Sequence, residues 1–431
     1  MNKYSLSGSV RYDDYNNFGV DRKYRATPLW SAGAKWNVAG EAFMKNASFV
    51  NTLALRATYG YNGNIAQDVY PFTSISLSSS YVTGLPTASI NQPANPSLRW
   101  EKTGLLNLGL DYGLFKNRLM GSVEWYSKKG KDILYQFPID PTYGVSTLTT
   151  NNTRIDAKGF EASVTGAFIR QKNIDWSATF LFSYNKNKLV DNRFQANSST
   201  YSSLSGANIV GYPTTALWVY RYAGLDNTGM TQVYAGDKST KLAPSQNPTS
   251  IDALYYAGTT VAPYYGSLSQ SFRYKNFTLF ALGTYSFGSV FRRPTVSTYT
   301  STRYPQVQYD LNRDIDKRWR VAGDETKTNV PGIAGVYAPV SLFRYAFSDI
   351  NVLSGSYIRL REVSLSYGVP AAIAKRALAK NIDFTFTVRN PGLLWTKNKE
   401  KIDPDFIPVL SQNTLALPPS ASYNMALGIN F

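Results

Sequence analysis

The chain has 431 residues, a formal net charge of +17, and neither cysteine nor histidine. Without cysteine there are no disulfides or thiolates, and without histidine the commonest metal ligand and the usual general base at neutral pH are missing, so we expect no metal, no cofactor and no enzyme. Lys and Arg are scattered through predicted turns and loops and form no stripe, so the positive charge does not indicate nucleic-acid binding.

Segments of about ten residues in which apolar and polar side chains alternate recur along the chain, and this is the length that a tilted strand needs to cross a bilayer. In the segment 51–61, for example, Leu53, Leu55 and Ala57 lie opposite Arg56 and Thr58. No stretch approaches the roughly 18 consecutive apolar residues of a membrane helix. We therefore predict about twelve transmembrane strands, in chain order near 3–13, 30–38, 51–61, 104–112, 119–127, 160–168, 176–184, 264–274, 277–287, 356–367, 382–389 and 420–431.

The connections between these strands alternate in length. Short polar turns at 116–118, 170–173 and 275–276 predict hairpins, whereas the segments 62–98, 130–157, 190–263, 288–354 and 396–419 are long. A brief helix is expected between Pro370 and Asn381. Short periplasmic turns and long extracellular loops are typical of an outer-membrane β-barrel. A soluble β-sandwich or solenoid is the alternative, but structureless loops of this length are uncommon in compact soluble domains.

The last predicted strand carries the clearest alternation. Tyr423, Met425, Leu427, Ile429 and Phe431 fall on one face, and small or polar residues fall on the other. A strand of this kind that ends the chain on an aromatic residue is typical of an outer-membrane barrel with its apolar face toward lipid. We place the chain in the bacterial outer membrane.

Several polar residues are candidates for acid–base catalysis or for binding a cation. Two carboxylates near each other could act as acid and base, but with no nucleophile or histidine a solvated barrel lumen is the better interpretation. The residues in question, on predicted lumen faces, are Asp111, Glu124, Glu161, Asp175 and Arg389. Asp403 with Asp405, and Asp324 with Glu325, could ligate calcium through oxygens, but neither pair has an EF-hand spacing and a loop turn is the default.

Aromatic residues are abundant in the long connections. They could stack on sugar rings or grip a peptide at the extracellular mouth, or they could pack the loops and line the membrane interface. For any single residue packing is favoured, but for at least a few together we predict substrate binding. The candidates are Tyr212, Trp218, Tyr220, Tyr222, Tyr255 and Tyr256, with Tyr264 and Tyr265 beside them. Trp125, Trp176, Phe182 and Tyr184 are assigned to the lipid face and its aromatic girdle.

Six segments, in the same order over about 330 residues, resemble motifs of the SusC/RagA family of TonB-dependent outer-membrane transporters. The longest, from Asn95 to Leu134, resembles the family's "NP…WE" start of a hairpin. The others are NNTRIDAKGFEASV from Asn151, GYPTTALWVYRYAGLDNTG from Gly211, RDIDKRWRVAGDE from Arg313, SGSYIRLREVSLSYGVP from Ser354 and IDPDF from Ile402.

The resemblance implies an architecture larger than this chain. Family members carry an amino-terminal signal, a small β-domain, a TonB-contacting segment, a plug domain and a 22-stranded barrel. We expect residues 1–431 to be the C-terminal portion of such a barrel, with the plug and the TonB-contact segments absent from this chain. An open twelve-stranded sheet would leave two unpaired edges in lipid, which supports the expectation that the chain is part of a larger barrel. A self-closed twelve-stranded barrel is the alternative.

The resemblance also implies a function. It predicts the barrel wall of a SusC-like importer for oligosaccharides or oligopeptides, driven through the TonB complex, covered by a SusD-like surface lipoprotein and surrounded by outer-membrane lipid. Tyr423 and Phe431 would then be the signal read by the barrel-assembly machinery. A passive porin or structural barrel is the alternative, and a membrane-embedded hydrolase is disfavoured by the missing histidine.

Overall fold

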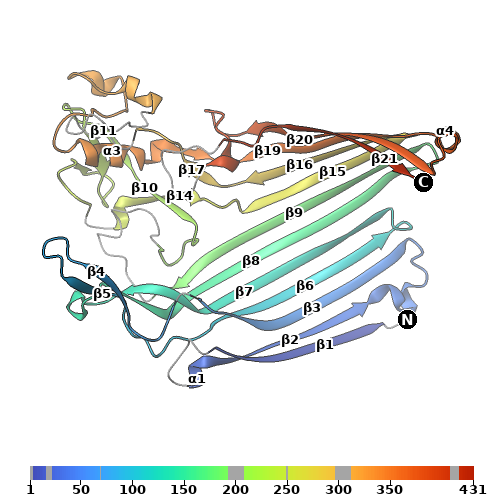
Figure 1. Cartoon of the computed structure of the whole chain (residues 1–431), viewed down its shortest axis with the longest axis horizontal. Coiled ribbons are helices and arrows are strands. Elements are labelled where there is room, and N and C mark those ends of the chain that lie inside the picture. The colour runs from blue at the N-terminus through green and yellow to red at the C-terminus, as the bar shows by residue number, and fades with distance from the viewer. Residues whose placement is uncertain are drawn as a thin grey trace. The chain divides into compact units, whose positions relative to one another are not determined.

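The computed structural model describes residues 3–15, 22–67, 69–192, 208–248, 251–296, 312–407 and 417–431. No helix among them is long and apolar enough to cross a membrane. Twelve long strands are hydrogen-bonded in the order in which they occur along the chain (Figure 1). They are β1 (Tyr4–Asp14), β2 (Ala26–Asn37), β3 (Val50–Asn64), β6 (Glu101–Leu114), β7 (Leu119–Pro138), β8 (Thr147–Arg170), β9 (Ile174–Asp191), β15 (Tyr264–Tyr274), β16 (Phe277–Phe287), β19 (Tyr357–Gly368), β20 (Asn381–Thr396) and β21 (Ser422–Asn430).

All twelve predicted strands are confirmed, and the pairs whose register is known are antiparallel. The chain divides into two compact units, which we describe separately. The first holds β1 to β7, the second holds the elements from β10 onward, and the hairpin β8–β9 is shared between them.

The predicted long loop at 130–157 is wrong for most of its length. β7 continues to Pro138 and β8 begins at Thr147. The alternation in the sequence marks only the part of each strand whose outer face is apolar. The backbone hydrogen bonds between the strands continue beyond that part, because they do not require apolar side chains. Strands β7 and β8 are therefore 20 and 24 residues long.

The short hairpin turns contain non-glycine residues with a left-handed backbone. Phe115, Lys116 and Asn117 have φ of 55°, 58° and 59° between β6 and β7, and Lys275 has φ of 51° between β15 and β16. Such turns reverse the direction of the chain within a few residues, so the two strands need no long loop between them. The predicted helix after Pro370 is α4 (Ala371–Arg376).

The two faces of the sheet differ as the alternation predicts. In the first unit, Leu6 is 87% exposed and Leu55 is 44% exposed, and in the second Leu427 is 56% exposed. Large apolar side chains in such numbers on an open sheet face are stable when that face meets lipid. The opposite face of β3, β6 and β7 carries ion pairs.

The long connections contain regular structure of their own, which the description of them as structureless did not anticipate. In the first unit, β4 (Ser74–Ser79) and β5 (Pro86–Gln92) form a hairpin. In the second, small sheets and one helix lie at the end of the long strands opposite α4 (Figure 1). These elements are β10 (Ala216–Tyr220), β11 (Tyr222–Leu225), β12 (Thr231–Tyr234), β13 (Lys241–Leu242), β14 (Leu254–Thr259), β17 (Val290–Arg292), β18 (Val352–Ser354) and α3 (Ala338–Ala346).

Short helices complete the described chain. They are α1 (Arg22–Arg25) and the 3-10 helices η1 (Val38–Gly40), η2 (Ala42–Met44), η3 (Pro141–Tyr143), η4 (Ile251–Ala253), η5 (Arg313–Lys317), η6 (Asp324–Thr326), η7 (Asp349–Asn351) and η8 (Pro404–Phe406). The α3 helix packs its buried Leu342 and Tyr345 into the loop region of the second unit. Ser341 on α3 accepts a hydrogen bond from the Thr231 amide at 2.7 Å, which joins α3 to β12.

Candidate functional site

Two of the predicted substrate-binding aromatics lie inside the loop region. Trp218 and Tyr220, on β10, are 5% and 4% exposed. The Trp218 ring lies 5.6 Å from the ring of Tyr256, its partner on β14. The Tyr220 amide donates to the Phe347 carbonyl at 2.9 Å. Burial of this degree is typical of residues that pack the loop region.

The remaining candidates are more accessible. Tyr255, opposite Val219 in the β10–β14 pair, is 40% exposed, and the Arg221 guanidinium lies 4.6 Å from its ring centroid. Tyr212, in the first unit, is 37% exposed. Tyr222 is partly buried and donates from its hydroxyl to the Asn329 carbonyl at 3.0 Å, and burial raises the pKa of that hydroxyl. Tyr255 and Tyr212 are therefore the most exposed of the six main candidates, and the neighbouring Tyr264 and Tyr265 are 43% and 42% exposed.

A charge network occupies the predicted lumen face of the first unit. Arg56 on β3 donates to both oxygens of Asp111, at 2.9 and 2.8 Å, and to Glu124 at 2.9 Å. Asn107 also donates to Glu124, at 3.1 Å, and the Lys35 ammonium lies 4.0 Å from Asp111. Because a guanidinium holds both carboxylates, they are not poised for acid–base chemistry. The lumen interpretation of these carboxylates is the one that the geometry favours.

The acidic pairs considered for calcium are held by other groups. In the second unit, Asp403 pairs with Arg359, and Asp405 pairs with Arg361 at 2.7 Å. The Asp324 carboxylate accepts from the Arg320 and Val321 amides, and Glu325 accepts from the Trp319 indole at 3.0 Å. Across the described residues, no group of three or more acidic side chains is arranged for a metal. Both acidic pairs serve loop structure, which was the default interpretation.

The segments that carry the family resemblance contact one another in pairs. In the first unit, the Asn151 side chain donates to the carbonyls of Arg99 and Asp132, at 2.7 Å each, and its oxygen accepts from the Arg99 amide. These bonds join the segment that begins at Asn95 to the one that begins at Asn151. The Asn151 side chain thus ties the segment before β6 to the middle of β7.

The second unit contains two further joints of this kind. Gly229, with φ of +77°, lies so close to the Trp319 ring that a Cβ there would be 2.3 Å from it. The Gly229 carbonyl also accepts from the Gly332 amide at 2.9 Å. The third joint is the pairing of Arg359 and Arg361 with Asp403 and Asp405. The motifs therefore mark the places where loops are anchored, a role that the sequence comparison with family patterns did not indicate.

Another buried ionic cluster holds the loop region of the second unit together. Arg293 donates to Asp314 at 2.5 Å, and Thr295 donates to the same oxygen at 2.7 Å. Burial raises the pKa of Asp314, but the hydrogen bonds from Thr295 and Arg293 outweigh it, so the pKa lies below its ordinary value. Arg344 on α3 donates to the carbonyls of Ala243 and Gln246, at 2.7 and 2.5 Å. Charged groups buried with such partners fix the loop conformation.

Of the predicted assembly residues, Tyr423 lies on β21 and Phe431 directly follows the last residue of that strand. Tyr423 and Phe431 are 70% and 76% exposed, and Tyr423 is on the same face as Met425 and Leu427. The Tyr423 ring is 6.5 Å from Phe386 on β20, and Lys380 donates to the Phe431 backbone oxygen at 2.7 Å. The exposure leaves both rings accessible, and their assembly role stays a prediction.

The family model described as "TonB dependent receptor-like, beta-barrel" matches residues 1–390. The chain belongs to this family. Its place in the bacterial outer membrane and its all-β fold are as predicted, and the family is one of transport receptors, in agreement with the prediction that the chain is not an enzyme.

Curated relatives of this β-barrel chain carry matching names. "TonB-dependent receptor P39" of Formosa agariphila is 28% identical over 435 residues, which cover 90% of this chain and 41% of the relative. "TonB-dependent receptor SusC" of Bacteroides thetaiotaomicron is 25% identical over 250 residues, covering 51% and 24%. The chain thus spans less than half the length of these relatives.

Solved structures show the same fold. The "RagAB peptide transporter" matches with a TM-score of 0.77 and 22% identity, over 99% of this chain and 46% of that chain. In its "closed-closed" state, titled a peptide importer, the TM-score is 0.76 at the same identity. Both matches show that this chain has the fold of the corresponding part of those chains.

Proposed function

We propose that this chain forms part of the barrel wall and the extracellular loops of a SusC/RagA-type importer that moves oligosaccharides or oligopeptides across the outer membrane. The observation that carries the proposal is the match of residues 1–390 to a TonB-dependent receptor barrel. The relative named SusC and the solved RagAB peptide importer support a nutrient of intermediate size.

Within this proposal, the aromatic residues of the long connections have two different roles. At the long-loop end, the second unit presents an aromatic ring beside a cation, Tyr255 with Arg221. An aromatic face with an adjacent guanidinium suits either a sugar ring or a peptide group, since both combine apolar faces with hydrogen-bonding edges. We assign substrate contact to Tyr255 and Tyr212. The buried Trp218 and Tyr220 support the loops behind them.

The partners belong to the same proposal. The similarity to the RagAB peptide importer supports a SusD-like surface lipoprotein that covers the long loops, and the family's name supports energy coupling through TonB. The plug and the TonB-contacting segments, which were predicted to lie outside this chain, stay predictions. Outer-membrane lipid would surround the apolar face.

The test uses the full-length protein in its native membrane. Cells that express it should take up labelled oligosaccharides or oligopeptides, uptake should stop when a protonophore collapses the inner-membrane gradient, and a lipoprotein should copurify. Uptake that continues undiminished after the gradient is lost would support a passive porin instead.

A variant pair tests the substrate contact. Tyr255→Ala should raise the substrate Kd about tenfold, the loss expected for a stacking ring of about 1.4 kcal/mol. Tyr274→Ala is the matched control, because Tyr274 is 46% exposed and lies at the opposite end of the strands, beside the β15–β16 turn. Equal affinities of the two variants would exclude Tyr255 as a binding residue.

A further inference from the structure

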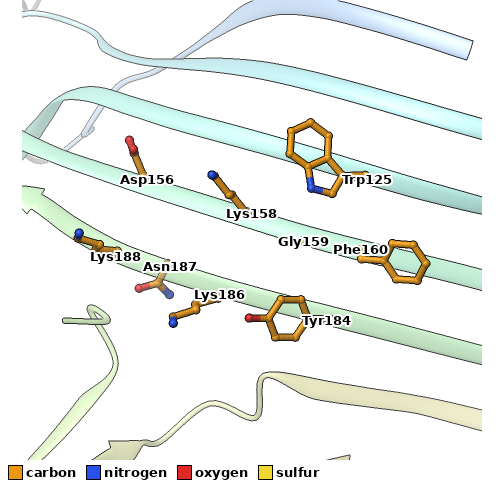
Figure 2. A pocket seen from close by; sticks show the side chains of 9 residues that line it. All are labelled: Trp125, Asp156, Lys158, Gly159, Phe160, Tyr184, Lys186, Asn187 and Lys188. Atoms are coloured by element: carbon orange, nitrogen blue, oxygen red, sulfur yellow. The ribbon is translucent and has the colours of Figure 1, made fainter. Parts of the chain in front are cut away.

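A cavity of about 550 Å³ opens on one face of β7, β8 and β9, within the first unit (Figure 2). Three ammonium groups line it, from Lys158 on β8 and from Lys186 and Lys188 on β9. Three aromatic rings line the same cavity: Trp125, Phe160 and Tyr184. No role in transport or assembly accounts for this combination.

The cavity lies on the lipid-facing side of the strands. On β7, Trp125 alternates with Glu124, which belongs to the Arg56 network on the lumen face. On β8, Lys158 and Phe160 flank Gly159, where a Cβ would lie 2.2 Å from the Tyr126 ring. Tyr126 has the same parity as Glu124, so Gly159 faces the lumen and its two neighbours face outward. The cavity is therefore separated from the substrate path by the sheet itself.

The lysines begin where the apolar band ends. Along β9 the outward-facing residues from Trp176 to Tyr184 are apolar or aromatic, and Lys186 is the next one on that face. These nine residues match the roughly 9–11 that a tilted strand needs to cross the hydrocarbon core. On β8 the apolar outward face runs from Phe168 back to Phe160, and Lys158 follows. All three cations thus sit just beyond the hydrocarbon, at the level of lipid headgroups.

The position of the lysines along the strands indicates the leaflet of the membrane in which they lie. The β8–β9 turn is only three residues long and lies at the other end of both strands. Because short turns of outer-membrane barrels face the periplasm, the lysines lie at the outer leaflet. That leaflet of a bacterial outer membrane is built of phosphorylated glycolipid.

The charge of the cavity favours an anion. Asp156 is the one acidic residue that lines it, against three lysines. In the part of the chain that the structure describes, none of the three ammonium groups forms an ion pair with a carboxylate, whereas Lys35 and Lys3 elsewhere in the unit do. Ammonium groups on flexible stems bind phosphate as point charges, and basic clusters at the membrane surface bind phosphorylated headgroups.

From this arrangement we propose that the cavity binds the phosphorylated headgroup of an outer-leaflet glycolipid. Lys158, Lys186 and Lys188 neutralise the phosphate, and Trp125, Phe160 and Tyr184 contact the sugar and the first part of the acyl chains. The bound lipid would stabilise β7, β8 and β9 from their lipid-facing side and would not enter the transport path. The proposal is independent of which nutrient the lumen carries.

The test is lipid binding to the full-length protein in nanodiscs, measured by native mass spectrometry. The probes are diphosphoryl lipid A, the same lipid after removal of its phosphates, and inorganic phosphate as competitor. Wild type should retain the diphosphoryl lipid at least tenfold better than the dephosphorylated one. Lys158→Gln/Lys186→Gln should lose at least tenfold of that retention.

The matched control is Lys129→Gln/Lys131→Gln, which removes the same charge from exposed residues on the same face of β7 but outside the cavity. It should change retention less than twofold. Equal losses in the two variants, or equal retention of the two lipids, would overturn the site. Displacement of the lipid by millimolar inorganic phosphate would overturn the assignment to a lipid in favour of a free anion. Normal heat-modifiable mobility of both variants shows that they are folded.

Discussion

The guanidinium of Arg359, on β19, forms a buried ion pair with the carboxylate of Asp403, 44 positions later in the chain and directly before η8. Arg359 is 3% exposed, and its Nε lies 3.1 Å from Asp405 as well. This pair anchors the segment after β20 to the wall of the second unit.

Removing Arg359 should destabilise the second unit strongly. Arg359→Met leaves Asp403 without its cation in a largely buried place and leaves Asp405 paired only with Arg361, which should lower the free energy of unfolding by about 3 kcal/mol. Arg361→Met, which removes a more exposed guanidinium from the same cluster, should cost about 1 kcal/mol. The measurement is the midpoint of heat-modifiable mobility of the full-length protein. Equal midpoints for the two variants would show that burial of the pair is unimportant.

The residues of the network around Arg56 should be coupled in their contributions to the free energy of unfolding. Because Arg56 holds Asp111 with two hydrogen bonds, Arg56→Ala and Asp111→Ala should have non-additive effects on the free energy of unfolding, with a coupling of about 1–2 kcal/mol. A double-mutant cycle measured by denaturant titration gives this coupling. Additive effects would mean that water already screens the pair.

Acid should loosen the loop region around Asp314. The pKa of this carboxyl is lowered in the folded state, so its stabilisation is complete above the ordinary pKa of 3.8 and is lost as the pH falls through the folded value. Pepsin cleavage within residues 312–346 should therefore rise below about pH 4. Asp314→Asn should already be cleaved faster at pH 5 and should show a flatter pH profile.

A neighbouring acidic residue provides the control for Asp314. Asp316→Asn changes an exposed carboxyl in the same 3-10 helix, and it should leave the pH profile of pepsin cleavage unchanged. If both variants respond alike, the acid sensitivity comes from general charge and the Arg293–Asp314 contact does not explain it.

In the loop region, replacing a buried aromatic residue should lower the free energy of unfolding more than replacing an exposed one. Trp218→Ala removes a buried ring and should lower the free energy of unfolding by about 3 kcal/mol, with disturbance of its partner Tyr256. Tyr255→Ala, at an exposed position, should cost less than about 1 kcal/mol. Thermal melts of the two variants test this difference, and a stable Trp218→Ala protein would contradict the packing role.

The terminal aromatic should affect assembly more than stability. Deleting Phe431 should lower the amount of protein in the outer membrane several-fold, because its exposed ring is free to be read by the assembly machinery. Phe431→Tyr retains an aromatic ring and should leave the level near that of wild type. Quantitative blots of outer-membrane fractions measure both. Unchanged levels and mobility after the deletion would remove the assembly role.

The sequence by itself determined the twelve strands and their order. This succeeded because the side-chain period of a strand is two and one face must be apolar in lipid, so residues such as Leu55 and Arg56 reveal their faces without any knowledge of neighbours. The hairpin turns, the α4 helix and the family motifs are equally local signals. They require only a few consecutive residues.

Only the tertiary structure decided what the polar and loop residues do. Asp403 and Asp405 look like cation ligands in the sequence, but Arg359, brought beside them by the fold, supplies their positive charge. Trp218 and Tyr255 look alike as loop aromatics, yet one is buried and the other is open. The lysines that line the cavity on β7, β8 and β9 come from two neighbouring strands. Such roles depend on contacts between residues far apart in the chain, and local periodicity carries no information about those contacts.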